Sequence, residues 1–323
     1  MHVEVVTPAR AGSQHGNRVT AERWAALLGE LGHTVSLTTS WSGEPVDVLV
    51  ALHARRSAEA VRAFRSAHPR HPVVLGLTGT DLYADLAVSL EAQESVQAAD
   101  ALVVLQDKAY DVLDPALYPR VHVIHQSVVS PARAAPPGPH LEVLLLAHLR
   151  AVKDPFLVVE ALRLLPPASL VRVTHLGAPL DAGSAQRAGD AAAADPRYRW
   201  LGDVPREAAL QRLADSDLLV LTSTLEGGAN AVSEAVAAGV PVVSTRIDGS
   251  LGLLGDDYPG YVEVGDAGGL ARALEQVATD QGFRAELTRQ VQARGHLFTP
   301  DRERQAWADL LASLSDSSAG QPA

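Results

Sequence analysis

Two glutamates, Glu226 and Glu234, are the residues of this chain whose type and spacing point most directly to chemistry. A double glycine, Gly227-Gly228, and the expected start of a helix near Asn230 lie between them. A glycine turn that opens a helix directs free backbone amides and the positive end of the helix dipole at one place, which favours an anion. Carboxylates beside that place can accept hydrogen bonds from vicinal hydroxyls. The pattern suits a ligand with both phosphates and hydroxyls, such as a nucleotide sugar.

A purely structural explanation of the same acids stays open. An acid at the position of Glu226 is favoured by the dipole of the following helix, and Glu234 would then be a solvated helix residue. The double glycine and Asn230 favour the binding interpretation, because the turn lies between two apolar runs, 217–221 and 240–244. These runs are the elements that must position the two carboxylates.

Short apolar runs alternate with amphipathic segments along the whole chain, which predicts parallel sheets covered by helices on both faces. The predicted strands are Val3–Thr7, Val35–Thr39, Val46–Leu52, Val73–Leu77, Ala101–Leu105, Val121–Ile124, Leu141–Ala147, Leu170–His175, Tyr198–Leu201, Asp217–Leu221, Val240–Ser244 and Gly260–Val264. The predicted helices include Asn17–Leu31, Ala58–Ser66, Pro155–Leu165, Glu207–Ala214 and Ala231–Ala238. The expected fold class is α/β, with two Rossmann-like domains that face each other across a cleft.

A proline-rich segment divides the two series of strands and sets the expected domain boundaries. We expect an N-terminal domain over 1–126, a linker over 127–140 and a C-terminal domain over 141–296. Residues 297–314 are expected to form a C-terminal helix that packs back on the N-terminal domain. The polar segment 315–323 is expected to be a disordered tail.

Composition excludes several classes of function. The 323 residues are 47% hydrophobic and 20% charged, which is typical of globular proteins. A net charge of −11 disfavours a nucleic-acid partner. The absence of cysteine excludes disulfides, thiolate nucleophiles and cysteine-bound metals. No leader pattern or spanning apolar run is present, so we expect a cytoplasmic protein without stable membrane insertion.

Polar residues also follow three predicted strands of the N-terminal half. The first of these segments is a glycine loop, 7–20, whose amides and side chains could hold phosphate at a helix start. The other two are 51–57, with a histidine and two arginines, and 77–83, with hydroxyls and a carboxylate. The residues of interest are Arg10, Gly12, Gly16, Asn17, Arg18, His53, Arg55, Arg56, Thr78, Thr80 and Asp81. They suggest a site for a compact anion, although a loop that merely joins elements, a structural histidine and surface arginines remain alternatives.

The C-terminal half resembles the GT4-type glycosyltransferases of the GT-B fold. The resemblance rests on Glu-Gly-Gly-x-Asn, a second Glu-Ala at the eight-residue spacing, and the following Ala-x-Gly-x-Pro-Val-Val. It implies that Glu234 holds the nucleotide ribose, that Glu226 contacts the donor sugar, and that amides of Gly227, Gly228, Ala229 and Asn230 lie near the sugar and diphosphate. The turn 198–205 resembles the family's base-binding turn, with backbone groups around Val204 meeting uracil.

The segment 147–155 resembles the same family's phosphate-binding segment, with Lys153 in the lysine position. A lysine there can neutralise the charge that grows on a departing diphosphate, whereas a surface lysine that opens a helix is the alternative. The family usually has arginine where this chain has His148, and Arg150 is a candidate to supply that charge. No metal or other cofactor is expected.

The N-terminal segments resemble one branch, the selenosugar synthases of selenoneine biosynthesis. The residues that carry this are Thr-Pro-Ala…Gly-Asn-Arg-Val-Thr-Ala-x-Arg-Trp, Ala-Leu-His-Ala-Arg-Arg-Ser and Leu-Thr-Gly-Thr-Asp-Leu-Tyr. The resemblance implies a UDP-sugar donor, typically UDP-N-acetylglucosamine, a selenophosphate acceptor, and a selenosugar, UDP and phosphate as products. Lys153, Glu226, His53 and Asp81 are the catalytic candidates. A GT4 enzyme with a hydroxyl acceptor and a nucleotide-sugar-binding protein without turnover remain alternatives.

Overall fold

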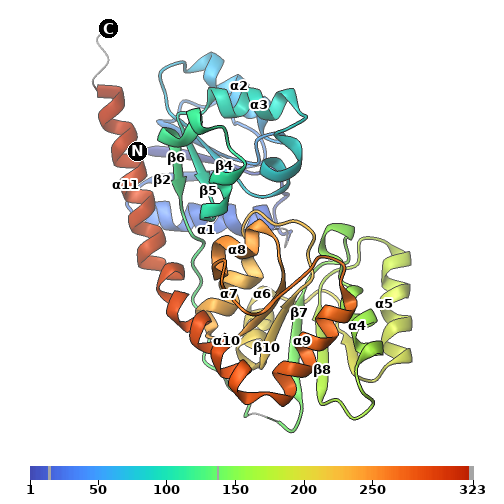
Figure 1. Ribbon diagram of the computed structural model, residues 1–323. Coiled ribbons are helices and arrows are strands. Elements are labelled where there is room, and N and C mark those ends of the chain that lie inside the picture. The colour runs from blue at the N-terminus through green and yellow to red at the C-terminus, as the bar shows by residue number, and fades with distance from the viewer. Residues whose placement is uncertain (14–15, 137, 320–323) are drawn as a thin grey trace. The chain divides into compact units, whose positions relative to one another are not determined.

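Two compact units make up the chain, and the computed structural model describes residues 1–13, 16–136 and 138–319. The first unit holds Met1–Gln126 together with helix α11 (Pro300–Ala319), and the second holds Ser127–Thr299. Each unit has its own parallel sheet (Figure 1). The expected linker, 127–140, belongs to the second unit, and its described residues form no helix or strand.

The first unit contains a six-stranded parallel sheet of order β2-β1-β3-β4-β5-β6. Its strands are β1 (His2–Val6), β2 (Thr34–Thr38), β3 (Val48–Leu52), β4 (Val73–Leu77), β5 (Ala101–Val104) and β6 (Val121–Val123). The chain runs outward from β1 to β2 and then returns to β3 on the other side. The order therefore reverses between β1 and β3, which is where α/β sheets bind ligands at the carboxyl ends of their strands.

Helices cover both faces of this first sheet. Helix α1 (Gly16–Glu30) and α11 pack on one face, and α2 (Ala58–Ala67) and α3 (Leu90–Ala98) pack side by side on the other (Figure 1). Short helical turns cover Asp81–Asp85 (a π-helical turn), Asp107–Asp111 and Pro115–Arg120.

Helix α11 is attached to α1 by aromatic packing and a buried carboxylate. The rings of Trp24 and Trp307 meet edge to face with their centroids 4.9 Å apart, and Trp24 Nε1 donates to Glu303 Oε1 at 3.1 Å. The helix continues to Ala319, beyond the expected end at Leu314 and into the segment for which we expect disorder. Residues 320–323 lie outside the described part of the chain.

The second unit contains another six-stranded parallel sheet, of order β12-β11-β10-β7-β8-β9. Its strands are β7 (Leu141–Leu146), β8 (Val171–Leu176), β9 (Tyr198–Trp200), β10 (Leu218–Leu221), β11 (Val242–Thr245) and β12 (Tyr261–Val262). The strand order reverses between β7 and β10, as in the dinucleotide-binding arrangement. The loops that follow these two strands therefore flank the expected ligand position.

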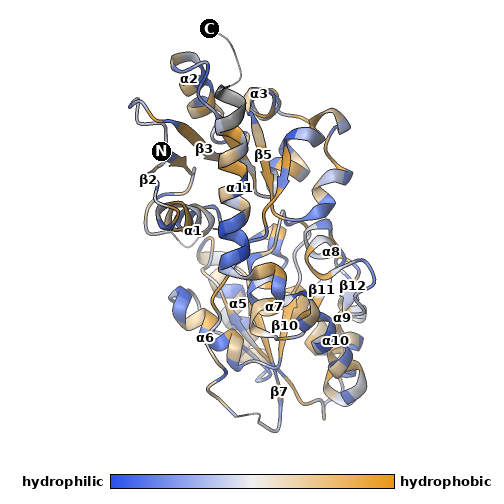
Figure 2. Ribbon diagram, turned by 90° about the vertical axis from the view of Figure 1, so that its left-hand side faces the viewer, coloured by the Kyte–Doolittle hydropathy of each residue, from blue (hydrophilic) through white to orange (hydrophobic). Residues whose placement is uncertain are grey.

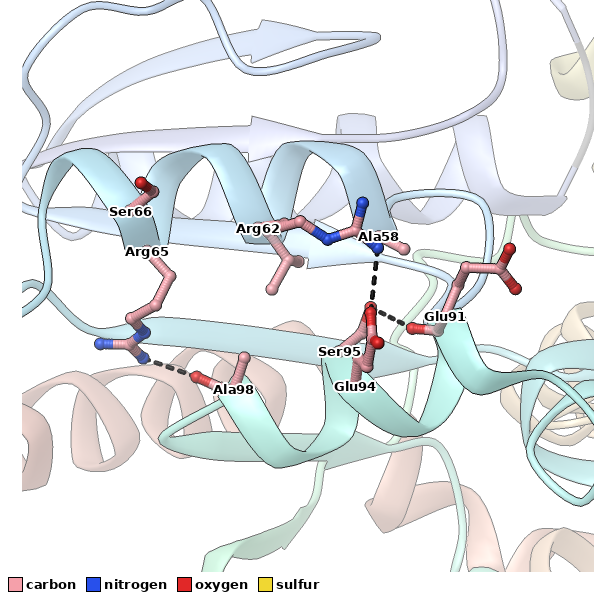
Figure 3. A pocket seen from close by; sticks show the side chains of 9 residues that line it. Ala58, Arg62, Arg65, Ser66, Glu91, Glu94, Ser95 and Ala98 are labelled. Carbon is pink, nitrogen blue, oxygen red and sulfur yellow. Dashed lines mark hydrogen bonds and ion pairs between the residues drawn. The ribbon is translucent and has the colours of Figure 1, made fainter.

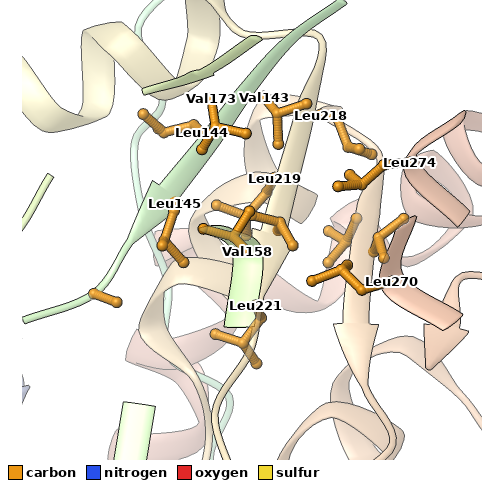
Figure 4. Close-up of a cluster of buried hydrophobic side chains, with 14 of the residues drawn as sticks. Val143, Leu144, Leu145, Val158, Val173, Leu218, Leu219, Leu221, Leu270 and Leu274 are labelled. Atoms are coloured by element: carbon orange, nitrogen blue, oxygen red, sulfur yellow. The ribbon is translucent and has the colours of Figure 1, made fainter. Parts of the chain in front are cut away.

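A single apolar cluster fills the second unit (Figure 4). Leucine and valine side chains of β7, β8 and β10 pack against helices on both faces, and the side chains of Val143, Leu145 and Leu219 are at most 1% exposed. The helices are α4 (Leu157–Leu164), α5 (Ala182–Ala194), α6 (Arg206–Asp215), α7 (Asn230–Ala238), α8 (Asp248–Leu254), α9 (Ala267–Thr279) and α10 (Gln281–Arg294), with short turns at Ala151–Lys153 and Gly295–Phe298.

The predicted fold class is confirmed: two α/β units, each with a parallel sheet. Every predicted strand overlaps an observed strand, and the predicted strand Val73–Leu77 coincides with β4. The reason is visible in the hydropathy of the fold, since β3 and β5 are strongly apolar, while hydrophilic residues gather on the helices, as on α11 (Figure 2). Strands that are buried on both faces need such continuous apolar runs.

A buried histidine on β8 fixes the strand beside the expected donor site. His175 is fully buried; its Nε2 lies 2.7 Å from the carbonyl oxygen of Ala147, and its Nδ1 lies 2.6 Å from Tyr198 Oη. These contacts fit a neutral ring in which Nε2 donates to the carbonyl and Nδ1 accepts from the tyrosine. Burial lowers the pKa of His175 from 6.5 to about 4.

This pKa predicts a pH-dependent stability. The unfolded chain takes up a proton near pH 6.5 and the folded chain near pH 4, so the stabilisation is fully present above pH 6.5 and is lost as the pH falls towards 4. We expect His175 to account for a loss of about 3 kcal/mol in unfolding free energy. Urea unfolding followed by tryptophan fluorescence should show a shallower pH dependence in His175→Gln. Identical slopes in both proteins would contradict the assignment.

Candidate functional site

The loops after β7 and β10 bring two of the predicted catalytic residues together. Lys153, in the short turn after β7, forms an ion pair through its Nζ with Glu226 Oε1. Ser223 Oγ donates to the same carboxylate oxygen at 2.7 Å. Both side chains are largely buried, at 28% and 13% exposed. The sequence therefore folds so that a cation and an acid meet where the strand order reverses.

Backbone contacts fix these two loops to each other. Thr222 Oγ1 donates to the carbonyl oxygen of Lys153 at 2.8 Å. The amide of Thr224 donates to the carbonyl oxygen of Val152, also at 2.8 Å. Gly249 of α8 lies against the second loop, where a Cβ atom would come within 2.3 Å of the carbonyl oxygen of Glu226. Only glycine allows this approach. The positions of Lys153 and Glu226 are thus set by the backbone as well as by their ion pair.

The glycine turn leads directly into α7, as predicted. Gly227 and Gly228 precede Ala229, which is the N-cap residue and whose methyl side chain makes no capping hydrogen bond; Asn230 is the first residue of the helix. The first turn of α7 contains no acidic side chain. A helix start without a capping side chain or acid presents its amides to an anion. That the amides of this turn bind a diphosphate remains a prediction.

The second glutamate of the motif is paired with a residue that the sequence analysis missed. Glu234 lies within α7 and is only 7% exposed, and its Oε1 is 2.6 Å from Nη1 of Arg206. Arg206 is the first residue of α6, directly after the turn 198–205. A signal was present: a cation at the first helical position opposes the helix dipole and needs a nearby anion. In that turn Val204 is half-buried against the apolar cluster.

His148 and Arg150 lie in the loop after β7, before Lys153. His148 is half-buried, and its Nδ1 accepts the amide of Ala178 at 3.0 Å. A neutral ring then carries its proton on Nε2. Arg150, also half-buried, precedes the turn that contains Lys153. Both residues belong to the same loop as Lys153, and their contact with a diphosphate remains a prediction.

In the first unit, the loops after β3 and β4 meet at His53. This residue is 2% exposed and has a positive φ of 76°, a conformation that a bulky side chain seldom adopts. Its Nδ1 accepts the amide of Arg56 at 3.4 Å, so that in the neutral ring Nε2 donates to Thr80 Oγ1, 3.2 Å away. Burial lowers the pKa of His53, while the nearby Asp81 carboxylate acts in the opposite direction. The neutral imidazole is thus a hydrogen-bond donor and not a cation.

Asp81 has a different position from that expected of a catalytic acid. Its carboxylate is fully buried and accepts the amides of Ala54 at 3.0 Å, Thr78 at 3.0 Å and Gly79 at 2.7 Å. A carboxylate held by three amides joins the loops after β3 and β4. The geometry shows that Asp81 positions the loops that carry His53 and Thr80, and its catalytic role remains a prediction.

An acid that the sequence analysis did not single out lies beside His53. Asp85 Oδ2 is 3.0 Å from Nε of Arg55 and 3.8 Å from Nε2 of His53. It ends the π-helical turn Asp81–Asp85, a rare local structure that often occurs at functional sites. Arg55 is therefore partly neutralised by Asp85, whereas the neighbouring Arg56 is exposed.

The glycine loop after β1 contains the remaining candidates. Gly12 has a positive φ of 77°, and Gly16 and Asn17 begin α1. Arg10 is exposed, and Arg18 pairs with Glu22 on its own helix at 2.6 Å. Residues 14 and 15 lie outside the described residues. The loop follows β1, which adjoins β3 at the point where the strand order reverses, so it lies at the same sheet edge as His53.

A separate pocket of about 310 Å³ lies between α2 and α3 (Figure 3). Arg62 Nη2 pairs with Glu94 Oε2 across it at 3.0 Å, and Arg65 donates to the carbonyl oxygen of Ala98. None of the predicted site residues lines this pocket. Within the described part of the chain, no group of three or more His, Asp or Glu side chains is placed to hold a metal ion. No described helix combines the length and the apolar character that a membrane crossing needs.

Comparison with known families decides the classification. Residues 131–294, just over half of the chain, match the family described as glycosyl transferases group 1. The chain belongs to the group 1 glycosyltransferases. The matched region contains Lys153, Glu226, Glu234 and Arg206.

Individual proteins are similar to this chain in sequence or in fold. A segment of 107 residues is 38% identical to the lipopolysaccharide core biosynthesis glycosyltransferase LpsE of Rhizobium meliloti, covering 31% of this chain and 30% of that protein. Among solved structures, Anabaena Alr3699/HepE in complex with UDP-glucose matches with a TM-score of 0.77 and 17% identity, over 97% of this chain and 100% of that one. Sucrose-phosphate synthase from Thermosynechococcus elongatus matches with a TM-score of 0.79 and 14% identity, over 98% and 99%. These two structures share the fold.

The environment of Asp81 predicts a loss of stability on substitution. In Asp81→Asn, an amide group replaces one acceptor oxygen and faces a backbone donor, so a buried hydrogen bond is lost along with the charge that strengthens the others. We expect the unfolding free energy of the first unit to fall by about 3 kcal/mol. Urea unfolding followed by tryptophan fluorescence measures this, with the exposed Asp111→Asn as the matched control. A change of the same small size in both variants would show that Asp81 does not hold the loops.

Proposed function

We propose that this glycosyltransferase takes its sugar from a UDP-sugar, with UDP-N-acetylglucosamine as the donor, and transfers it to selenophosphate. The products are a selenosugar, UDP and phosphate. The observation that carries the donor half of the proposal is the Lys153–Glu226 pair, which lies where the strand order reverses and beside the uncapped start of α7. A cation, the N-terminus of a helix and a carboxylate at one place match the diphosphate and the hydroxyls of a nucleotide sugar.

The residues of the second unit divide the donor between them. Lys153 and the first amides of α7 neutralise the diphosphate, and Glu226 accepts a hydroxyl of the sugar. Glu234 accepts the ribose hydroxyls, and backbone groups near Val204 meet the uracil. The complex of Anabaena HepE with UDP-glucose, which has the same fold, supports a UDP-sugar as the donor.

The first unit provides the acceptor site in this proposal. His53 and Thr80 offer hydrogen-bond donors, and Arg55 and Arg56 offer positive charge, all at the end of the sheet where β1 and β3 adjoin. This combination suits a small anion that carries several oxygens. The resemblance of these segments to selenosugar synthases supports selenophosphate as that anion.

The reaction requires little proton transfer. The selenium of selenophosphate attacks the anomeric carbon, and the bond from that carbon to the diphosphate oxygen breaks, with the electron pair leaving on UDP. Lys153 and the α7 amides stabilise the charge that develops on this leaving group. Water then cleaves the phosphorus–selenium bond and releases phosphate and the selenosugar. The proposed reaction needs no metal, because Lys153 and the amides at the start of α7 stabilise the negative charge of the leaving group.

A hydroxyl acceptor is the second candidate. It is favoured by the 38% identity to LpsE, a lipopolysaccharide core biosynthesis glycosyltransferase, within the 107 aligned residues. That alignment covers 30% of LpsE, so it supports the family and does not identify the acceptor.

Turnover with alternative acceptors tests the proposal. We expect release of UDP from UDP-N-acetylglucosamine with selenophosphate, and a fall of at least about 100-fold in kcat for Lys153→Ala, because the leaving group loses its cation. The matched control is Arg163→Ala, an exposed cation on α4 of the same unit. Turnover with alcohol acceptors only would replace the selenium reaction by the second candidate, and donor binding without any turnover would exclude both.

The Lys153–Glu226 pair gives a second prediction. In Glu226→Gln, no ion pair has to break before Lys153 can bind the diphosphate. We therefore expect the affinity for UDP to rise about threefold or more. In the same variant kcat should fall, because the sugar hydroxyl loses the carboxylate that accepts its hydrogen bond. Calorimetric titration with UDP measures the first effect, with the exposed Glu207→Gln as the control. A weaker affinity for UDP in Glu226→Gln would contradict the exchange of partners at Lys153.

A further inference from the structure

The pair formed by Arg206 and Glu234 joins two helices of the second unit. Arg206 Nη1, at the start of α6, is 2.6 Å from Oε1 of Glu234, which lies in the first half of α7. The side chain of Glu234 is 9% exposed and that of Arg206 is 38% exposed. The carboxylate is thus nearly removed from solvent, and the guanidinium is its charged partner.

The location of Arg206 is electrostatically unfavourable for its own helix. The first turn of a helix carries a partial positive charge, so a cation there costs a few tenths of a kcal/mol or more. Pro205, the N-cap residue of α6, provides no side-chain hydrogen bond that would offset this. The ion pair with Glu234 compensates for the electrostatic cost of a cation at the start of α6. It indicates that Arg206 acts on α7 and not on its own helix.

The pairing also determines which lone pairs of Glu234 remain for a ligand. The guanidinium forms an ion pair with Oε1, which is buried and accepts no hydrogen bond from the described residues, so the attraction draws that oxygen toward α6. The second oxygen can then accept hydrogen bonds, and a carboxylate accepts well from two neighbouring hydroxyl groups. The cis diol of a ribose presents such a pair.

We propose that Arg206 is a positioning residue that fixes Glu234 for the ribose diol and so determines the preference for a nucleotide with both ribose hydroxyls. This inference rests on the proposed function, because it needs a UDP-sugar in the second unit. Arg206 also follows the turn 198–205, to which the family resemblance assigns the base. A single short segment therefore reaches from the base to the acid that holds the ribose.

The test compares UDP with 2′,3′-dideoxy-UDP by calorimetric titration on the full chain. We expect the wild-type protein to prefer UDP by at least about tenfold, because the diol bonds to a charged acceptor. In Arg206→Gln the preference should shrink to less than about threefold, mainly through weaker binding of UDP. Arg206→Lys should recover part of the preference, and Glu234→Gln should lose it to the same extent. The control is Arg212→Gln, an exposed arginine on the same helix.

Each result has a distinct meaning. A wild-type protein that does not bind UDP would overturn the proposed function and the inference with it. An unchanged preference for UDP over the dideoxy nucleotide in Arg206→Gln would overturn the inference alone. An equal loss of affinity for both nucleotides would also overturn it, because a merely structural role produces that result. If Arg206→Gln does not fold, the preference in Arg206→Lys and Glu234→Gln decides in the same way. A wild-type preference in both of these variants would reject the positioning role.

Discussion

The ion pair between Lys153 and Glu226 is the interaction on which the proposed site depends. It joins the loops of two adjacent strands, β7 and β10, at the one place in the second sheet where the chain turns from one direction to the other. Helices α4 and α7 follow these strands on opposite faces of such a sheet, and the two loops flank the position between them. The close approach of Gly249 and the hydrogen bond of Thr222 keep the two loops in contact. A ligand at this point meets a cation, an acid and the start of a helix together.

The same pair explains how an acidic protein can bind a strongly anionic donor. The overall charge of −11 repels a diphosphate, but two cations of the second unit are held against carboxylates, Lys153 by Glu226 and Arg206 by Glu234. The pairs hold these charges in place before a ligand arrives, and in the proposed complex Lys153 exchanges Glu226 for the diphosphate. In the proposed complex the carboxylates accept from the hydroxyls of the donor, Lys153 pairs with its phosphates, and Arg206 stays paired with Glu234.

Much of this could be predicted from the sequence, and the remainder depends on tertiary packing. Apolar runs bounded by polar turns marked the strands, and the glycine turn and the family resemblance of the following loops singled out Glu226 and Lys153. The partner of Glu234 was not found, since Arg206 reaches it only through the packing of α6 against α7. The catalytic role of Asp81 remains a prediction, but its three backbone hydrogen bonds could not be predicted, because only the folded loops bring those amides together.

The central claim is that the second unit holds the diphosphate of a UDP-sugar between Lys153 and the start of α7. A crystal structure of the protein with bound UDP tests it most directly. We predict a phosphate oxygen within hydrogen-bond distance of Lys153 Nζ and of an amide in the first turn of α7, with the ribose hydroxyls on Glu234. UDP bound elsewhere, or bound with Lys153 still paired to Glu226 and away from the phosphates, would contradict it.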